Sequence, residues 1–190
     1  MRGREKFKKY KLLIEMVTAL YSIFPKRILK LLLVHHRKTT GTKGMLLRYA
    51  LLKNLANHIG ENVSIHPDVY LFNVEKLRIG DNVSIHPLCY FEAYGGIEIG
   101  NDVSIAHNVS ILSVSHNYKG SDIPIKDQGL TAKPVIISNN VWIGAKVTVL
   151  GGVKIGSGSI IGSGAVVTKN IGNNKVAVGV PANNIKDRLL

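Results

Sequence analysis

Residues 137–168 read ISNNVWIGAKVTVLGGVKIGSGSIIGSGAVVT, and this stretch decides the fold. An aliphatic side chain recurs in it every six residues, at Ile137, Ile143, Val149, Ile155, Ile161 and Val167. Glycine follows three of these residues, as Gly144, Gly156 and Gly162. A period that keeps its register over many repeats is typical of a solenoid, in which each repeat packs on its neighbours.

The same six-residue period extends upstream to residue 59. Its positions are Ile59, Ile65 and Leu71, then Ile79, Ile85 and Phe91, then Ile99, Ile105 and Ile111. Within a group the step is six residues, and between groups it is eight, which adds a two-residue corner. Three strands of about six residues make one triangular turn, with every sixth side chain pointing into the prism. We therefore expect a mainly β fold, a parallel β-helix of about five turns over residues 59–172.

The period breaks once, between Ile111 and Ile137, where 26 residues separate positions that the repeat would place six apart. Long insertions in a solenoid project as loops and usually serve function. We expect one long inserted loop over about residues 112–136. His116 stands at its mouth, in the sequence Ser115-His116-Asn117-Tyr118. A C-terminal tail of about residues 173–190 follows the last repeat.

The positive charge of the chain is concentrated in residues 1–58. This segment holds 14 of the 25 Lys and Arg residues but only two of the 12 acids, Glu5 and Glu15. A basic surface can bind nucleic acid, an anionic membrane, an acidic glycan or a phosphorylated cofactor. The segment has no interleaved aromatic residues, zinc pattern or recognisable nucleic-acid motif, so we expect no nucleic-acid partner.

We expect residues 1–58 to form amphipathic helices over Arg4–Ser22, Lys26–His36 and Met45–Asn57, with Gly41 and Gly44 in a turn before the last. No stretch reaches the roughly 20 apolar residues of a membrane span. Two interpretations remain open: the helices pack on the main domain and keep a solvated basic face, or they rest on an anionic membrane surface.

Cys89 is the one cysteine of the chain, which excludes an internal disulfide and a cysteine-based zinc cluster. This usage is typical of a reducing cytoplasm. The residue lies in an ordinary repeat without a readable histidine partner, so we expect it to pack in the core rather than act as a nucleophile.

The segment from Ile137 to Pro181 resembles the hexapeptide-repeat acyltransferases, above all the maltose and galactoside O-acetyltransferases and polysaccharide O-acetyltransferases. The resemblance is carried by NNVWIG at 139–144, GSGAVVTK at 162–169, GVPA at 179–182 and SHNY at 115–118. It covers residues 59–190. It implies a left-handed β-helix, a homotrimer with active sites between subunits, acetyl-CoA as acyl donor and a saccharide acceptor, with no metal required.

The resemblance also implies roles for residues near the loop. His116 matches the family's general base, which removes the proton of a sugar hydroxyl as that hydroxyl attacks a thioester. An imidazole suits this task at neutral pH. The expected substrate-binding residues are Glu92 in the preceding turn, His107, Asn117 and Tyr118.

For the cofactor, the resemblance points to a groove along the last turns. The expected cofactor-binding residues are Trp142, Ala145, Ser163, Thr168, Lys169 and Lys186. Trp142 would pack near the pantetheine arm, and the small residues would hydrogen-bond its amides. Lys169, with Lys186 and Arg188 in the tail, could meet the phosphates.

Two other histidines compete for a function. His66 and His86 lie 20 residues apart in two copies of Ser-Ile-His-Pro, so we expect them to stack on adjacent turns. A stacked pair could bind a metal, although a duplicated surface ladder explains the register better. A carbonic-anhydrase-like site would need a third ligand, and His107 does not share the register of the pair.

The sequence therefore predicts acetyl transfer from acetyl-CoA to a saccharide hydroxyl by direct attack, without an acyl-enzyme. The basic helices favour a surface glycan (capsular, O-antigen or exopolysaccharide) or its lipid-linked precursor, and a cytoplasmic protein that contacts the inner face of the membrane. The alternatives are N-acetylation of an amino sugar and a non-enzymatic β-helix scaffold.

Overall fold

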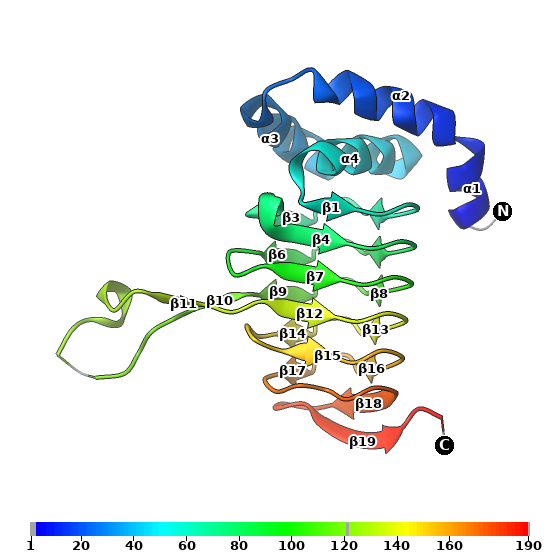
Figure 1. Cartoon of the computed structure of the whole chain (residues 1–190). Coiled ribbons are helices and arrows are strands. Elements are labelled where there is room, and N and C mark those ends of the chain that lie inside the picture. Colours follow the sequence, from blue (N-terminus) through cyan, green and yellow to red (C-terminus); the bar gives the residue numbers. More distant parts are fainter. Residues whose placement is uncertain (1–2, 121, 190) are drawn as a thin grey trace.

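The repeated aliphatic residues form three parallel β-sheets, which are the faces of a prism capped by helices at one end (Figure 1). The structure is a computed structural model and describes residues 3–120 and 122–189. Each successive strand passes to the next face, so that strands far apart in sequence pair in register. The predicted β-helix is confirmed.

The first sheet has the order β1-β4-β7-β12-β15. Its strands are β1 (His58–Ile59), β4 (Leu77–Ile79), β7 (Ile97–Ile99), β12 (Val135–Ile137) and β15 (Lys154–Ile155). The second sheet runs β19-β18-β16-β13-β8-β5-β2. Its strands are β2 (Ser64–Ile65), β5 (Ser84–Ile85), β8 (Ser104–Ile105), β13 (Trp142–Ile143), β16 (Ile160–Ile161), β18 (Lys175–Val178) and β19 (Asn183–Asp187).

The third sheet has the order β17-β14-β9-β6-β3. Its strands are β3 (Tyr70–Phe72), β6 (Tyr90–Glu92), β9 (Ser110–Leu112), β14 (Thr148–Val149) and β17 (Val166–Val167). The three sheets make five complete turns, as predicted. A partial sixth turn follows, because Ile171 bridges to Ile155 and β18 pairs with β16. The tail thus continues the β-helix, and β19 closes it by pairing antiparallel with β18.

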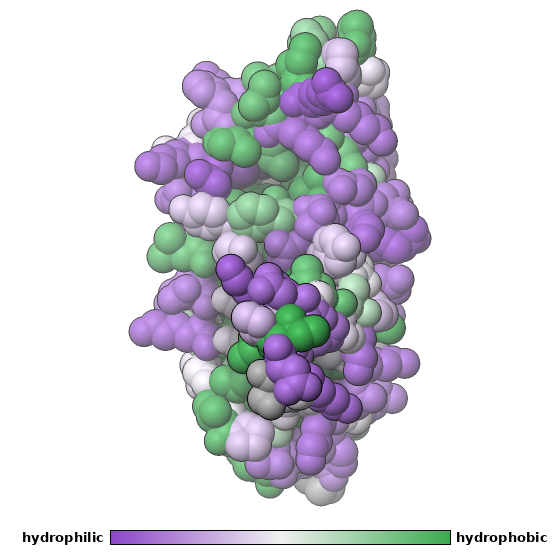
Figure 2. Space-filling model, turned by 90° about the vertical axis from the view of Figure 1, so that its left-hand side faces the viewer, coloured by the Kyte–Doolittle hydropathy of each residue, from purple (hydrophilic) through white to green (hydrophobic). Residues whose placement is uncertain are grey.

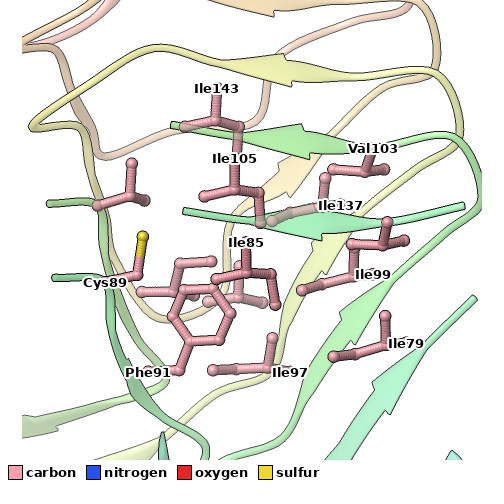
Figure 3. Packing of buried hydrophobic residues seen from close by; sticks show 14 of the residues in the cluster. Ile79, Ile85, Cys89, Phe91, Ile97, Ile99, Val103, Ile105, Ile137 and Ile143 are labelled. Atoms are coloured by element: carbon pink, nitrogen blue, oxygen red, sulfur yellow. The ribbon is translucent and has the colours of Figure 1, made fainter. Parts of the chain in front are cut away.

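The repeat positions supply the core of the prism. Ile85, Ile105 and Ile143 stack in register on the second sheet and are fully buried (Figure 3). Phe91, on the third sheet, fills the interior beside them. Each such side chain contributes about 1.5–3 kcal/mol through removal of apolar surface from water.

One corner of the prism is closed by a ladder of Asp and Asn side chains. The side-chain oxygen of Asn101 accepts a hydrogen bond from the backbone N–H of Asp81 at 2.7 Å, and Asn139 does the same for Asn101 at 2.8 Å. Gly80 is required in this ladder, because a Cβ there would lie 2.2 Å from the Asn101 oxygen. The glycine after the repeat residue therefore makes room for the side chain of the next turn.

The N-terminal segment folds into helices that cap the first turn (Figure 1). They are α1 (Gly3–Lys9), α2 (Lys11–Ser22), α3 (Lys26–His35), the 3-10 helix η1 (His36–Lys38) and α4 (Gly41–Leu55). Leu51, Leu52 and Leu55 of α4 are buried against the prism. α2 and α3 lie on α4, on the side away from the prism. In the described part of the chain, every helix is too short or too polar to cross a membrane.

Two details of the predicted helices are wrong. The first predicted helix is broken at Tyr10, so that α1 and α2 are separate elements. Gly41 and Gly44 do not form a turn but lie in the first turn of α4, which begins four residues before Met45. Gly44 is needed there for close approach, since a Cβ would lie 1.9 Å from the Thr39 carbonyl oxygen.

Arg48 joins the cap to the β-helix. Its buried guanidinium donates hydrogen bonds to the carbonyl oxygens of Ile65 at 3.0 Å, His36 at 2.8 Å and Thr39 at 2.7 Å. A buried charge requires such partners. One side chain therefore fixes α4, the preceding loop and the first turn relative to one another.

Removing the largest core side chain should reveal how much the stacked interior contributes. We expect Phe91→Ala to lower the free energy of unfolding by about 3–5 kcal/mol, because it leaves a cavity in the prism. Phe72→Ala is the matched control: this ring is 42% exposed, so the loss should be about 1 kcal/mol or less. Chemical denaturation of both variants measures the difference, and equal losses would contradict this view of the core.

Candidate active site

The inserted loop forms a two-stranded arm that projects from the prism (Figure 1). β10 (Val114–His116) and β11 (Leu130–Ala132) pair antiparallel, and the 3-10 helix η3 (Ile125–Asp127) lies farther out. The arm leaves the prism after β9 and returns at β12, at the edge between the third and first sheets. The predicted long insertion is confirmed.

His116 is the last residue of β10 and pairs with Leu130 across the arm. Its side chain is exposed. The imidazole is thus held by a hairpin backbone near the root of the arm and remains open to a ligand. This geometry is compatible with the predicted general base.

Asn117 stabilises the arm next to His116. Its side-chain amide donates to the Gln128 carbonyl at 3.0 Å and its side-chain oxygen accepts from the Thr131 hydroxyl. Its backbone N–H donates to the Gly129 carbonyl at 3.1 Å. These bonds give Asn117 a positioning role beside the predicted contact with substrate. Tyr118, which follows, is 73% exposed.

Ser113 anchors the root of the arm, and the sequence analysis did not single it out. It is fully buried, and its hydroxyl donates to the Glu92 carbonyl at 2.6 Å and accepts from the Gly95 N–H at 2.8 Å. Its own carbonyl accepts from Lys133 N–H at 2.9 Å, which holds the returning strand. A small polar residue two positions after the last regular repeat residue was the available signal.

Glu92 lies on the outer face of the third sheet, in register with Leu112 at the start of the inserted loop. Its carboxylate accepts a hydrogen bond from the Asn73 amide at 2.6 Å. Asn73 precedes the 3-10 helix η2 (Val74–Lys76) in a left-handed conformation. The structure therefore places Glu92 one strand away from the strand that leads into the arm.

His107, Ala145 and Ser163 lie on a second edge, between the second and third sheets. They occupy equivalent positions after β8, β13 and β16, which pair in register. Ala145 accepts a hydrogen bond from Gly164 N–H at 2.8 Å, which joins successive turns at this corner. Trp142 stands nearby on β13 and is 54% exposed. The structure thus brings four of the predicted residues to one edge.

The other predicted cofactor residues lie elsewhere. Thr168 and Lys169 follow β17, at the edge from which the arm also leaves, and both are exposed. Lys186 is exposed on β19, opposite Val176. Arg188 donates to the Gly158 carbonyl at 2.8 Å. Within one chain, the predicted cofactor residues are therefore divided among separate edges.

Two hollows mark the surface away from these residues. One of about 330 Å³ lies among α1, α2 and α4, lined by Phe7, Ile14 and Tyr49 among others. The other, of about 370 Å³, lies along the first sheet and includes Arg78 and Glu98. Among the described lining residues of either hollow there is none of the predicted site residues. Enclosure of a ligand at His116 would need an additional surface.

His66 and His86 stack as predicted, with ring centroids 4.7 Å apart and planes at 12°. Parallel stacked rings do not aim their nitrogens at a common point. In residues 3–120 and 122–189 no group of three or more His, Cys, Asp and Glu side chains is arranged to hold a metal ion. Burial lowers the pKa of His66, and the charges of His86 and Arg48 lower it further.

Cys89 packs in the core as predicted. Its thiol is fully buried and donates to the Ala106 carbonyl at 3.1 Å. Burial raises the pKa of this thiol to about 11. A thiol with this pKa is protonated at neutral pH and does not serve as a nucleophile.

Known proteins share this architecture. Residues 134–169 match the family described as bacterial transferase hexapeptide (six repeats). The galactoside O-acetyltransferase of Escherichia coli (strain K12) is 33% identical over 140 residues, which cover 74% of this chain and 68% of that protein. The crystal structure of a maltose O-acetyltransferase from Clostridium difficile 630 superposes with a TM-score of 0.76, at 29% identity over 88% of each chain. A galactoside acetyltransferase in complex with coenzyme A gives 0.75, at 30% identity over 86% of this chain and 80% of the other.

The histidine stack should make stability depend on pH. Below about pH 6.5 the unfolded chain protonates His66, whereas burial opposes protonation in the folded chain. The free energy of unfolding therefore falls as the pH drops below that value and is unaffected above it. In His66→Gln, the midpoint of thermal unfolding should fall less between about pH 7.5 and about pH 5 than in the wild type. The exposed His58→Gln serves as control, and identical falls in all three proteins would refute the linkage.

Proposed function

The chain belongs to the hexapeptide-repeat acetyltransferases, and from this premise we propose that it acetylates a saccharide hydroxyl with His116 as general base. Acetyl-CoA is the acyl donor, in keeping with the coenzyme A bound by the galactoside acetyltransferase described above. The observation that carries the assignment of the base is the exposed imidazole of His116, held at the root of the only arm formed by the described residues.

The chemistry requires one proton acceptor at the attacking oxygen. The sugar hydroxyl attacks the thioester carbonyl carbon while His116 takes the hydroxyl proton, and a C–O bond forms. The tetrahedral intermediate then collapses, the C–S bond breaks, and the departing sulfur takes a proton from the imidazolium. The products are the O-acetyl saccharide and free coenzyme A, with no covalent intermediate on the protein.

We place the acceptor between the arm and the outer face of the third sheet. Glu92 accepts hydrogen bonds and can hold sugar hydroxyls, and it lies one strand from the strand that leads into the arm. Asn117, Tyr118 and His107 are the further acceptor contacts of this proposal. The acceptor is a surface glycan or its precursor, and the reaction takes place in the cytoplasm or at the inner face of the membrane.

The site is completed by a second chain. The arm and the edge that carries Trp142, Ala145 and Ser163 leave the prism at different corners, so one chain alone does not join them. A homotrimer with cyclic symmetry would bring the arm of one subunit against this edge of its neighbour. The exposed indole of Trp142 would then pack on the pantetheine arm of acetyl-CoA.

The phosphates of the cofactor need cationic partners. The exposed Lys169 and Lys186 are the candidates at the end of the prism farthest from the cap, and Thr168 adds a hydroxyl. Charge-assisted hydrogen bonds to phosphate are stronger than neutral ones. These residues would set the affinity for acetyl-CoA rather than the chemical step.

The role of His116 can be tested by thiol release from acetyl-CoA. Turnover of His116→Ala should fall about 10²–10⁴-fold, because the proton acceptor is lost, whereas coenzyme A binding should persist. The matched control is His58→Ala, an exposed histidine next to the cap, which should retain wild-type turnover.

The same assay examines the acceptor, with hydroxyl-only sugars and amino sugars run in parallel. Wild-type turnover in His116→Ala would remove it as the base. Turnover confined to amino sugars would replace O-acetylation by N-acetylation.

A further inference from the structure

Helix α2 is apolar on two opposite sides. Its inner side, with Ile14 and Tyr21, packs against the core. Its outer side carries Leu12, Met16 and Leu20, which are 73%, 62% and 56% exposed. A helix that is apolar around most of its circumference is normally covered on both sides. The described part of the chain covers only the inner side.

Helix α3 continues this apolar surface. Leu29 faces inward and is buried, whereas Leu31 and Val34, on the opposite side of the helix, are 71% and 59% exposed. In the turn that joins the two helices, Ile23 is 76% exposed. Figure 2 shows apolar residues gathered over the upper end of the molecule, where α2 and α3 lie, with hydrophilic residues beside them. We call the outer side of α2, the turn and α3 the cap face.

The basic residues of the cap divide into two groups. Three of them form ion pairs with acids of the β-helix and hold the cap on the prism: Arg4 with Asp102, Lys11 with Glu61, and Lys30 with Glu75. The second group includes Lys26 and Arg27 at the start of α3, which are exposed and make none of the ion pairs found among the described residues. Arg27 lies on the same side of α3 as Leu31 and Val34.

This combination selects the partner. Residues 1–58 contain 14 Lys and Arg against two acids, so a second copy of the cap would meet it with like charge. A surface of apolar side chains bordered by cations fits an interface that is apolar inside and negatively charged at its surface. We propose that the cap face docks on an anionic lipid bilayer, with α2 and α3 lying in the plane of the headgroups.

The energetic scale supports reversible attachment. Each base near an anionic leaflet contributes about 1 kcal/mol, and the effect decays within a Debye length of about 8 Å at physiological salt. The exposed leucines and methionine add burial of apolar surface, at about 25 cal/mol per Å². Few of the bases can reach one plane, so attachment should be weakened by salt.

Docking at the cap also orients the active site, and this point rests on the proposed function. The arm leaves the prism after the third turn from the cap, on its side (Figure 1). With turns about 4.8 Å apart and helix layers about 10 Å thick, His116 would lie on the order of 30 Å from the surface. A glycan attached to the same bilayer would be acetylated on sugars well away from its lipid anchor.

Vesicle flotation of the full chain tests the docking without requiring turnover. We expect binding to phosphatidylcholine vesicles that contain phosphatidylglycerol, no binding to phosphatidylcholine alone, and weaker binding as salt is added. Leu12→Ser/Met16→Ser/Leu20→Ser should bind at least about tenfold more weakly. The matched control is Ile185→Ser/Leu189→Ser, whose side chains are 59% and 75% exposed at the far end of the prism and should leave binding unchanged.

A second pair of variants isolates charge. Lys26→Gln/Arg27→Gln should weaken binding to anionic vesicles about tenfold, because about 1 kcal/mol is lost per base. Lys146→Gln/Lys154→Gln removes the same charge from exposed positions of the β-helix and should change binding little. Circular dichroism and sedimentation establish that each variant is folded and assembled as the wild type.

Three results would overturn the proposal. The first is equal binding to neutral and anionic vesicles, and the second is unchanged binding by the triple serine variant. The third is a doubling of the wild-type mass that the triple serine variant abolishes, because the cap face would then bind a second copy. Loss of acetyl transfer with vesicle binding intact would refute the proposed function and leave the docking untouched.

Discussion

Backbone hydrogen bonds between successive turns hold every other feature of this protein in place. Ser84 N–H donates to the Val103 carbonyl, and Ser104 N–H to that of Val141, each at 3.0 Å. These bonds fix the register in which the aliphatic residues stack, and the stacked residues exclude water from the bonds. The same spacing determines where a corner residue falls, because residues at equivalent repeat positions share an edge. The arm and the edge that carries Trp142 are consequences of this register.

The active-site arm depends on the ladder at one point. Ser113 ties the first strand of the arm to the backbone of Glu92 in the turn before, and Lys133 ties the second strand to Ser113. A hairpin supported in this way presents His116 at a fixed place without adding to the core. The helical cap is attached differently, through the buried Arg48 and ion pairs, so the surface that meets a partner is separate from the site of chemistry.

The sequence predicted what depends on period. Ile85 and Ile105 are buried where a six-residue repeat places them, and the stacking of His66 on His86 follows from the same register. It predicted less where one residue type serves two purposes. Gly44 was expected in a turn because glycine is frequent there, yet it permits contact with the Thr39 carbonyl, which depends on tertiary packing.

The site shows the same limit. Spacing aligned His107, Ala145 and Ser163 on one edge, because a repeat fixes relative position along the prism. It did not separate that edge from the edge of the arm, which depends on how three faces close. The anchoring by Ser113 also escaped the sequence, since an isolated serine next to an insertion resembles any loop residue until its partners are known.

The central claim is that each active site joins the arm of one subunit to the Trp142 edge of its neighbour, and mixed trimers test it most directly. His116→Ala lacks the base, and Ser163→Trp obstructs the cofactor edge, so each variant alone should be inactive. In trimers assembled at random from equal amounts of both, about one quarter of the sites would combine an intact arm with an intact edge. We predict that co-expression of the two variants restores about a quarter of the wild-type thiol release per site. Activity no higher than that of either variant alone would contradict a site shared between subunits.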